Sequence, residues 1–315
     1  MKKMVALVIC ICLAGVAAWW LRLPAAPVEI TIPPGSTAHE VASILYRSHV
    51  ISFPFVFLQA VQLSGKAKDL KAGTYFISPR SSVLAVINVI TSGRVHAIKV
   101  TIPEGFTARQ VADRLAAAGV AQGDKFMALV EQKKLEGYLF PETYLFKLKS
   151  TEEEIAGTMV KEFRRHFTPE MEAKAKAMHM EEGQVVTLAS IIEKEAKRAE
   201  ERPLISAVFH NRLKKHWYLE SCATVLYALG EHKAKLTYKD LKIDSPYNTY
   251  HHLGLPPGPI CNPGVDSIRA ALYPATTDDM FFVAGSSGTH VFSRYFNEHL
   301  RNKKLQSKKK TPAKK

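Results

Sequence analysis

The chain has 315 residues, of which 47% are hydrophobic, so it can hold a membrane segment and two or three modest domains. Its formal net charge is +14, but residues 301–315 hold eight lysines or arginines and no acid, which is more than half of the excess. The rest of the chain has no basic stripe interleaved with aromatic residues, so nucleic acid is not an expected partner. We predict that residues 301–315 form a disordered tail, either simply solvated or bound to an anionic partner such as lipid headgroups or wall polymer.

The N-terminal segment, residues 1–23, predicts a membrane anchor. Two lysines precede an apolar run at residues 4–20, which is long enough to span a bilayer once, with the N-terminus in the cytoplasm. Residues 24–27 then form a stiff linker, and everything beyond lies outside the cytoplasm. A cleaved signal peptide is the alternative, although the run is long for one and its cleavage site is mediocre.

An internal repeat follows the linker. Residues 28–45 resemble residues 98–115 at an offset of seventy positions. Each copy contains an alternating strand, a Pro-x-Gly turn, a threonine cap and a short amphipathic helix. We expect two related α/β units, at residues 28–97 and 98–148. Their polar residues are of turn and cap types, which favours a binding or positioning role over chemistry.

The predicted fold class is α+β. Periodic patterns predict a series of helices before and after the second repeat, and alternation predicts a strand at 70–77 and a terminal hairpin at 280–284 and 290–292. The predicted helices lie at residues 53–64, 82–91, 124–134, 151–166, 168–178, 184–197, 203–215, 224–229 and 267–273. We expect residues 149–300 to form a separate mixed α+β domain.

The helix at 184–197 contains two acidic residues beside its apolar stripe. Helical spacing places Glu193 and Glu195 on opposite flanks of this stripe, too far apart around the helix to face one cleft together. A carboxyl group held against apolar neighbours has a raised pKa, which suits a general acid. The alternative is a buried structural glutamate paired with a basic residue.

Two further segments combine polar and aromatic residues outside helices. Residues 135–146 contain Glu136 and Tyr138, and could form either a sugar-binding surface or a structural corner. Residues 245–264 are rich in proline and glycine and contain Asn248 and Tyr250. Rigid loops with such side chains are typical of functional sites.

Metal chemistry and nucleophilic chemistry are not predicted. The histidines and cysteines lack metal-ligand spacing, and neither a Gly-x-Ser-x-Gly elbow nor a phosphate-binding glycine loop is present. Cys222 and Cys261 would lie in an oxidising compartment, where they could form a disulfide or remain as free buried thiols. Carboxylate chemistry therefore remains the best candidate, including glycoside cleavage assisted by the substrate.

A set of motifs in this order is similar to that of the MltG (YceG-like) endolytic murein transglycosylases. They are LEGYLFPETY (135–144), ASIIEKEA (189–196), HNRL (210–213), ATVLYALG (223–230), SPYNTY (245–250) and GLPPGPICNPG (254–264). The N-terminal anchor and the repeated, LysM-like units also match. The resemblance extends over nearly the whole chain except the basic tail.

The resemblance implies cleavage of the β-1,4 bond between N-acetylmuramic acid and N-acetylglucosamine in nascent peptidoglycan, within the strand, leaving a 1,6-anhydro-muramyl end. It assigns the acid/base role to Glu193, with no metal or other cofactor. Asn248 and Tyr250 would orient the 2-acetamido group, and Glu136 and Tyr138 would line the sugar groove. The implied location is the bacterial cytoplasmic (inner) membrane, with the catalytic domain outside the cytoplasm and membrane-bound glycan polymerases as further partners.

Several alternatives remain open alongside this family resemblance. Glu195 would be structural, paired with Arg212, and Cys222 stands where many family members carry an acid. A disulfide with Cys261 could compensate for that change. In place of an enzyme, the chain could be a non-catalytic, membrane-anchored peptidoglycan-binding scaffold, and in place of a transglycosylase it could be a muramidase-type hydrolase.

Overall fold

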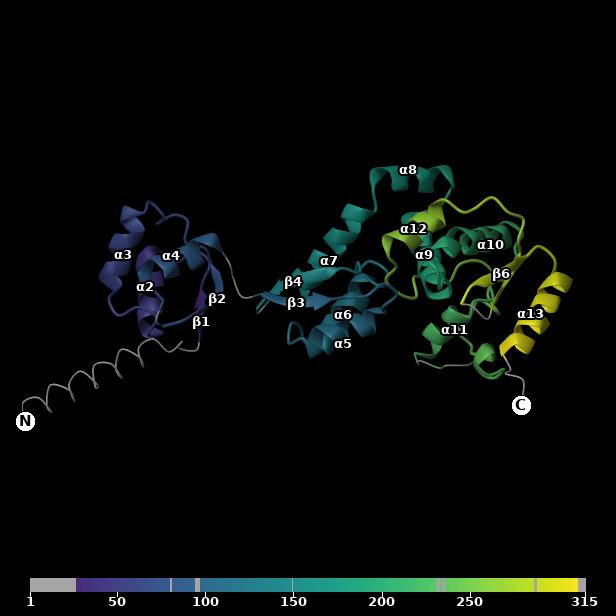
Figure 1. The fold of residues 1–315 in the computed structure, drawn as a ribbon, viewed down its shortest axis with the longest axis horizontal. Coiled ribbons are helices and arrows are strands. Elements are labelled where there is room, and N and C mark those ends of the chain that lie inside the picture. Colours follow the sequence, from purple (N-terminus) through teal and green to yellow (C-terminus); the bar gives the residue numbers. More distant parts are fainter. Residues whose placement is uncertain are drawn as a thin grey trace, which may run out of the picture. The chain divides into compact units, whose positions relative to one another are not determined.

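The structure is a computed structural model that describes residues 27–79, 81–93, 97–148, 150–230, 233, 236–285 and 288–310 (Figure 1). Contacts divide the chain into two compact units. The first extends to Ile98 and includes residues 147–149, and the second contains residues 99–146 and 150–315.

The first unit is a small α+β fold around a two-stranded antiparallel sheet. Strand β1 pairs with β2 so that Val28 lies opposite Ile77, and Thr31 contacts Thr74 at 3.2 Å between their hydroxyl oxygens. Helices pack over the sheet and bury a core that includes Tyr75 and Phe57. The elements are β1 (Val28–Ile32), α2 (Ala38–Arg47), α3 (Pro54–Leu63), β2 (Gly73–Ile77) and α4 (Val83–Ser92).

The internal repeat is reproduced in three dimensions. The second copy begins with β3 (Ala97–Thr101) and α5 (Ala108–Ala117), continues through α6 (Gly123–Lys133) and ends with β4 (Thr143–Lys147), which pairs with β3. Thr37 and Thr107 occupy equivalent helix N-caps, and each completes a reciprocal capping box with the residue three positions later. The threonine cap predicted in each copy is therefore confirmed.

The remainder of the second unit is mainly helical and packs around α9. Eight consecutive residues of α9, Val185–Ile192, are buried in the largest core, against α10, α11 and α12. The predicted terminal hairpin is confirmed as β5 and β6. The elements are α7 (Glu152–His166), α8 (Pro169–Ala177), α9 (Glu182–Glu195), η1 (Ala199–Glu201), α10 (Arg202–Lys214), α11 (Cys222–Leu229), η2 (Asp240–Lys242), α12 (Val265–Leu272), β5 (Phe281–Ala284), β6 (His290–Ser293) and α13 (Phe296–Lys310).

Two terminal predictions have different outcomes. Residues 301–310 belong to helix α13, so the prediction of disorder from residue 301 was wrong for this part of the tail. The segment contains neither glycine nor proline and is rich in lysine, which is a good helix former. The predicted anchor at 1–23 lies outside the described residues, and within those residues no helix combines the length and apolarity needed to cross a bilayer.

Candidate active site

Helix α9 carries both candidate carboxylates at its C-terminal end. The helix stops at Glu195, earlier than predicted, because Ala196 adopts an extended conformation with ψ of 122°. Glu193 contacts α12 and the start of α10, whereas Glu195 contacts the segment that begins α11. The prediction that the two carboxylates face different surroundings is confirmed.

Glu193 is enclosed by hydrogen-bond donors. Its Oε2 accepts the Gly264 N–H at 3.1 Å and the Ser267 hydroxyl at 2.7 Å, and its Oε1 lies 3.4 Å from the Arg202 guanidinium. Only 8% of the side chain is exposed. The flank that looked apolar by periodicity is therefore polar, and both oxygens of Glu193 hold neighbouring elements together.

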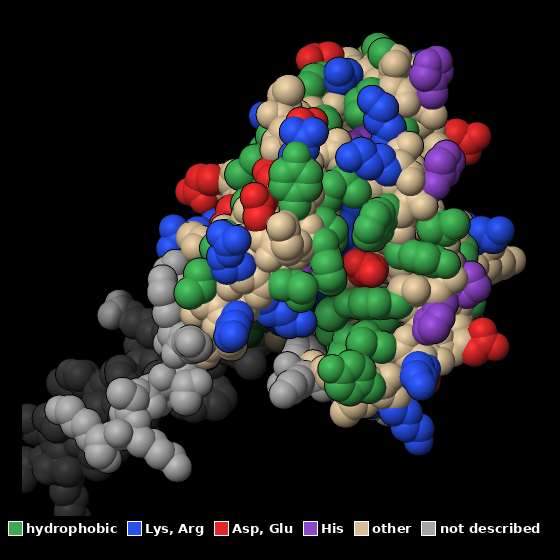
Figure 2. Space-filling view, turned by 90° about the vertical axis from the view of Figure 1, so that its right-hand side faces the viewer, with side chains coloured by type: hydrophobic (Ala, Val, Ile, Leu, Met, Phe, Trp, Pro, Cys, Tyr) green, Lys and Arg blue, Asp and Glu red, His purple; other side chains and the backbone are tan. Residues whose placement is uncertain are grey.

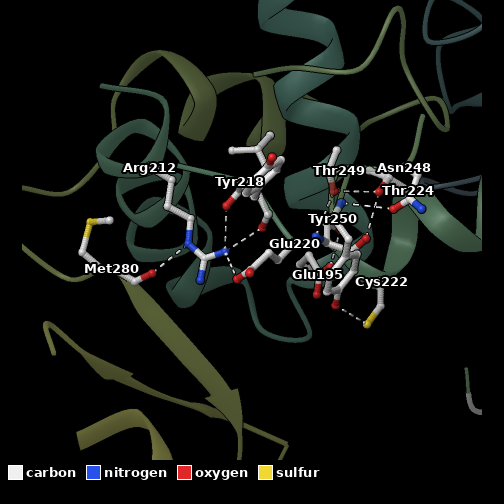
Figure 3. A network of polar contacts seen from close by, with 12 residues as sticks. Glu195, Arg212, Tyr218, Glu220, Cys222, Thr224, Asn248, Thr249, Tyr250 and Met280 are labelled. Carbon is white, nitrogen blue, oxygen red and sulfur yellow. Dashed lines mark hydrogen bonds and ion pairs between the residues drawn. The ribbon is translucent and has the colours of Figure 1, made fainter. Parts of the chain in front are cut away.

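Glu195 has a different environment (Figure 3). Its Oε1 accepts a short hydrogen bond of 2.6 Å from the Ser221 hydroxyl, and, like Glu193, the residue as a whole is half-buried. Burial raises the pKa of Glu195, while Ser221, His290 and Arg212 act in the opposite direction. A carboxyl group that tends to hold its proton is suited to general acid catalysis.

Arg212 does not form the ion pair with Glu195 that we predicted. Its Nη1 donates to the carbonyl oxygen of Leu219 at 2.8 Å and to Glu220 Oε2 at 3.1 Å, and its Nε donates to the carbonyl oxygen of Met280 at 2.8 Å. The guanidinium is buried, and its hydrogen bond to Leu219 fixes the backbone that leads into Ser221 (Figure 3). Arg212 affects Glu195 through its charge and through the position of this segment.

The loop after η2 places Tyr250 beside this site. The Tyr250 hydroxyl lies 3.2 Å from Cys222 Sγ, and burial raises the pKa of Tyr250, with further contributions from Cys222 and Glu195. Thr249 is buried, and its Oγ1 accepts the Ser221 N–H at 3.0 Å. The loop and the start of α11 thus support each other around Glu195 (Figure 3).

Asn248 is fully buried in this structure, and the substrate contact predicted for it stays a prediction. Its Nδ2 donates to the carbonyl oxygens of Leu241 and Ile243, and its Oδ1 accepts the Tyr250 N–H. All of these bonds lie between residues 241 and 250, within η2 and the loop that follows it. Asn248 therefore shapes the loop that presents Tyr250.

Glu136 connects three parts of the second unit. Its carboxylate accepts the Ala108 N–H at the start of α5, lies 3.3 Å from Asn262 Nδ2, and accepts the Tyr227 hydroxyl at 3.3 Å. Burial raises the pKa of Glu136 to about 7, against the lowering effect of these hydrogen bonds and of Lys194. Glu136 is therefore another carboxyl group in this unit whose pKa is raised by burial.

A cavity of about 650 Å³ opens beside Glu136. Tyr138, which we predicted to line a groove, is part of its wall, and Arg164 lies over the ring at 5.9 Å. The cavity combines aromatic rings and prolines with a few polar groups, as small-molecule sites commonly do. Among its lining residues are Glu136, Tyr138, Gln184, Tyr227, Tyr247 and Pro257.

Comparison with known proteins identifies the family of this chain. A model of the YceG-like family matches residues 30–305. The chain belongs to the YceG-like family. It is 37% identical over 302 residues to the endolytic murein transglycosylase of Bacillus subtilis, covering 86% of this chain and 82% of that protein.

Two further relatives support the family assignment. The endolytic murein transglycosylase of Streptococcus pneumoniae D39 is 28% identical over 321 residues, which are 87% of this chain but only 57% of the longer relative. The crystal structure of a yceG-like protein from Listeria monocytogenes superposes with a TM-score of 0.59 at 36% identity, covering 87% of this chain and 98% of that one.

In this YceG-like chain Cys222 and Cys261 are both free thiols, so the disulfide considered from the sequence is not formed. Cys222 is exposed beside Tyr250, whereas Cys261 is buried, with its Sγ 3.3 Å from the carbonyl oxygen of Ser190. The two thiols therefore lie in different environments.

One group of potential metal ligands occurs within the described residues. Ligand atoms of Glu142, Glu162 and His166 lie within 4.8 Å of one another. Glu162 already bonds to Arg165 and to His166, so a cation would compete with an arginine there. The group belongs to α7 and the start of β4, and includes neither α9 carboxylate.

Hydrophobic side chains gather on the face of the second unit that Figure 2 shows, with an acidic side chain among them. Aromatic contacts run from Trp217 through Phe281 to Phe296, and Trp217 remains 43% exposed. Residues 217–220 lead directly into Ser221. The sequence did not single out Ser221 or Trp217, because their roles depend on contacts between segments far apart in the chain.

Proposed function

We propose that this chain is a lytic transglycosylase that cuts peptidoglycan strands internally, with Glu195 as the general acid and base. The observation that carries the proposal is the environment of Glu195: a buried carboxyl group with a raised pKa, which accepts a hydrogen bond from Ser221 and lies near Tyr250. Relatives in the same family carry the name endolytic murein transglycosylase, and that name supports the choice of murein as substrate.

The choice of Glu195 over Glu193 rests on the hydrogen-bond donors that surround each carboxyl group. Both oxygens of Glu193 already have donors, and these donors bind it to α12 and to Arg202. Glu195 accepts a short bond from a serine hydroxyl that can rotate and a backbone hydrogen bond from Ala223, and burial raises its pKa. A general acid must hold a proton that it can give to the leaving oxygen of its substrate, which favours Glu195.

The proposed reaction has two proton transfers through one carboxyl group. Glu195 first donates its proton to the glycosidic oxygen between N-acetylmuramic acid and N-acetylglucosamine, and the bond from the muramyl C1 to this oxygen breaks. The muramyl 6-hydroxyl oxygen then bonds to C1, and its proton returns to Glu195. The 2-acetamido group stabilises the cationic centre between these steps, and Tyr250 lies beside it. The cycle needs neither a metal nor another cofactor.

The cavity beside Glu136 is the proposed binding site for the sugars next to the cleaved bond. Aromatic rings such as those of Tyr138, Tyr227 and Tyr247 offer faces on which sugar rings can stack, and Glu136 and Gln184 offer hydrogen bonds. Helix α11 connects the two regions, because Cys222 at its start contacts Tyr250 and Tyr227 near its end contacts Glu136. A glycan strand lying along α11 would reach both Tyr250, beside Glu195, and the cavity beside Glu136.

We further propose that residues 1–23 anchor the chain in the cytoplasmic membrane, with the catalytic part outside the cytoplasm. The apolar run at 4–20 and the lysines before it support this placement. The repeated units are proposed as LysM-like modules that position glycan, and membrane-bound glycan polymerases as partners. Fractionation of cells, with extraction of the membranes at alkaline pH, tests the anchor. Release of the chain into the soluble fraction would contradict it.

The reaction itself is tested with the full chain in detergent and uncrosslinked glycan strands, whose products are read by mass spectrometry. The proposal predicts shorter strands with anhydro-muramyl ends, because no water enters the reaction. Products that have each gained one water would establish a hydrolase instead. Intact strands that remain bound to the protein would favour a binding scaffold.

A further inference from the structure

Helix α3 of the first unit presents an apolar face to solvent. Phe53, the N-cap, and Phe55, in the first turn, are 69% and 70% exposed, and none of the ten residues of α3 is charged. The outward side of a surface helix is ordinarily charged or polar, and exposed apolar patches mark surfaces that bind a protein or a membrane. The α3 apolar face consists of Phe53, Phe55, Val56 and Leu63, all of them exposed.

The internal repeat contains a matched helix without such a face. Helix α6 has in the second copy the place that α3 has in the first, since each helix buries a phenylalanine as its fourth residue, Phe57 in α3 and Phe126 in α6. The four positions of the α3 apolar face are also exposed in the second copy, but there they carry polar or charged side chains. The fold therefore does not require apolar residues at these positions. The counterparts are Gln122, Asp124, Lys125 and Gln132.

The sequence places the first copy next to the proposed membrane anchor. Strand β1 begins at Val28, and the chain from residue 23 to residue 28 can span at most about 18 Å. A compact unit of about 70 residues has a radius of gyration of about 11 Å, so its diameter exceeds the length of this tether. With residues 1–23 in the bilayer, the first unit would lie against the membrane surface. The second copy follows seventy positions later and is not held there by the tether.

The charge of the first copy also suits a phospholipid surface. Residues 28–97 contain six lysines or arginines and three acidic residues. Three of the lysines, Lys66, Lys68 and Lys71, belong to the segment that follows α3. Apolar side chains near basic ones are typical of proteins that rest on anionic membranes, because the apolar area and the charge both contribute to binding.

We propose that the α3 apolar face lies in the interfacial layer of the cytoplasmic membrane, on its extracytoplasmic side. The inference rests on the proposed anchor, and the occupant of the face is phospholipid. Lipid is favoured over a protein partner because the short tether already holds the face near the bilayer. Burial of the two phenylalanine rings, the valine and the leucine stabilises the contact in proportion to the apolar area removed from water. Docking would give the first unit a fixed orientation on the membrane.

The test is quenching of tryptophan fluorescence by brominated phospholipids. The full chain is reconstituted in vesicles of phosphatidylglycerol and phosphatidylethanolamine, with and without bromine on the acyl chains. Phe55→Trp is the reporter, in a background in which Trp19→Phe and Trp20→Phe leave Trp217 as the remaining native indole. After the signal of the background chain is subtracted, we expect bromine to lower the fluorescence of the reporter by about twofold or more.

The second copy supplies the matched controls. Asp124→Trp, at the position of α6 equivalent to Phe55, should show no quenching. Phe53→Gln and Val56→Lys, added to the reporter chain, introduce the second-copy residues at two positions of the face. This chain should lose its quenching and keep the thermal unfolding midpoint of the reporter chain.

An unquenched Phe55→Trp in chain that stays in the vesicles would overturn the inference, and so would quenching that persists after Phe53→Gln and Val56→Lys. Crosslinking of the face to a membrane protein in cells, together with an unquenched reporter, would assign the face to a protein partner instead. Failure of the anchor is distinguished from these results, because the chain would then leave the vesicles at alkaline pH. Failure of the proposed reaction would be seen only as the absence of anhydro ends.

Discussion

The Ser221 hydroxyl donates a hydrogen bond of 2.6 Å to Glu195 and at the same time caps helix α11 through the Ala223 N–H at 3.2 Å. One side chain thus connects the start of α11 to the end of α9. The backbone around Ser221 is held in turn by Thr249 and by Arg212, through the carbonyl oxygen of Leu219. The position of Glu195 therefore depends on residues from three parts of the chain.

Replacement of Ser221 by alanine should lower activity and raise the pKa of Glu195, because a donor that stabilises the carboxylate is lost. We expect kcat/KM to fall by about tenfold, the equivalent of one hydrogen bond, and its high-pH limb to move upward. Loss of the cap should lower the free energy of unfolding by about 1 kcal/mol. Ser221→Thr, which keeps the hydroxyl, is the matched control. An unchanged pH profile in Ser221→Ala would show that the bond does not affect the acid.

Replacement of Asn248 by alanine should destabilise the loop that presents Tyr250. Three hydrogen bonds to buried or partly buried backbone groups are lost, so we expect the free energy of unfolding to fall by about 1–3 kcal/mol. Urea denaturation measures this change, and His252→Ala in the same loop, an exposed position, serves as control. Wild-type stability combined with weaker glycan binding would support the direct substrate contact that the sequence suggested.

Replacement of Glu136 by glutamine should change how stability depends on pH. The folded pKa of Glu136 is about 7, above its ordinary value of 4.5, so its protonated form stabilises the fold at low pH and this contribution is lost between about pH 4.5 and pH 7. Glutamine does not titrate. As the pH rises across this window, the free energy of unfolding of the wild type should therefore fall by about 3 kcal/mol relative to that of the variant.

This difference is measured by urea denaturation at several pH values from 4.5 to 8. Glu172→Gln, at an exposed position, should show no such trend relative to the wild type. A constant difference between wild type and Glu136→Gln would mean that Glu136 stays ionised throughout.

Replacement of Trp217 by alanine should weaken binding of glycan strands. The indole is 43% exposed beside the segment that leads into Ser221, and it packs edge-on against Phe281 at 5.9 Å between ring centroids. Loss of one stacking surface should raise KM by roughly three- to tenfold, with kcat little changed. Tyr238→Ala removes an exposed aromatic ring from a different segment and provides the comparison. A fall in kcat alone would instead indicate that Trp217 supports the catalytic segment.

Local sequence patterns predicted much of this fold. The duplicated capping boxes at Thr37 and Thr107, the buried stripe of α9 and the terminal hairpin all follow from short-range spacing, which the sequence shows directly. Helical spacing also predicted correctly that Glu193 and Glu195 lie on different sides of the helix and contact different elements. These features depend on neighbours within a few positions of one another.

The errors concern contacts between distant segments. Periodicity placed Glu193 against apolar neighbours, but Ser267 and Arg202 arrive from later helices and surround it with donors. Arg212 was predicted to pair with Glu195 and instead bonds to Glu220 and to backbone carbonyl oxygens. No spacing within one helix contains this information, because the partners are brought together only by the tertiary fold.

The central claim concerns which of two carboxyl groups, two residues apart, transfers the proton. Glu195→Gln and Glu193→Gln are compared as full chains, with the rate of anhydro-end formation and the unfolding midpoint measured for each. We predict that Glu195→Gln folds normally and loses about 10²–10⁴-fold or more in rate. Glu193→Gln should be less stable but keep its rate within about tenfold of the wild type. A folded Glu193→Gln without activity, beside an active Glu195→Gln, would contradict the account and return the acid/base role to Glu193.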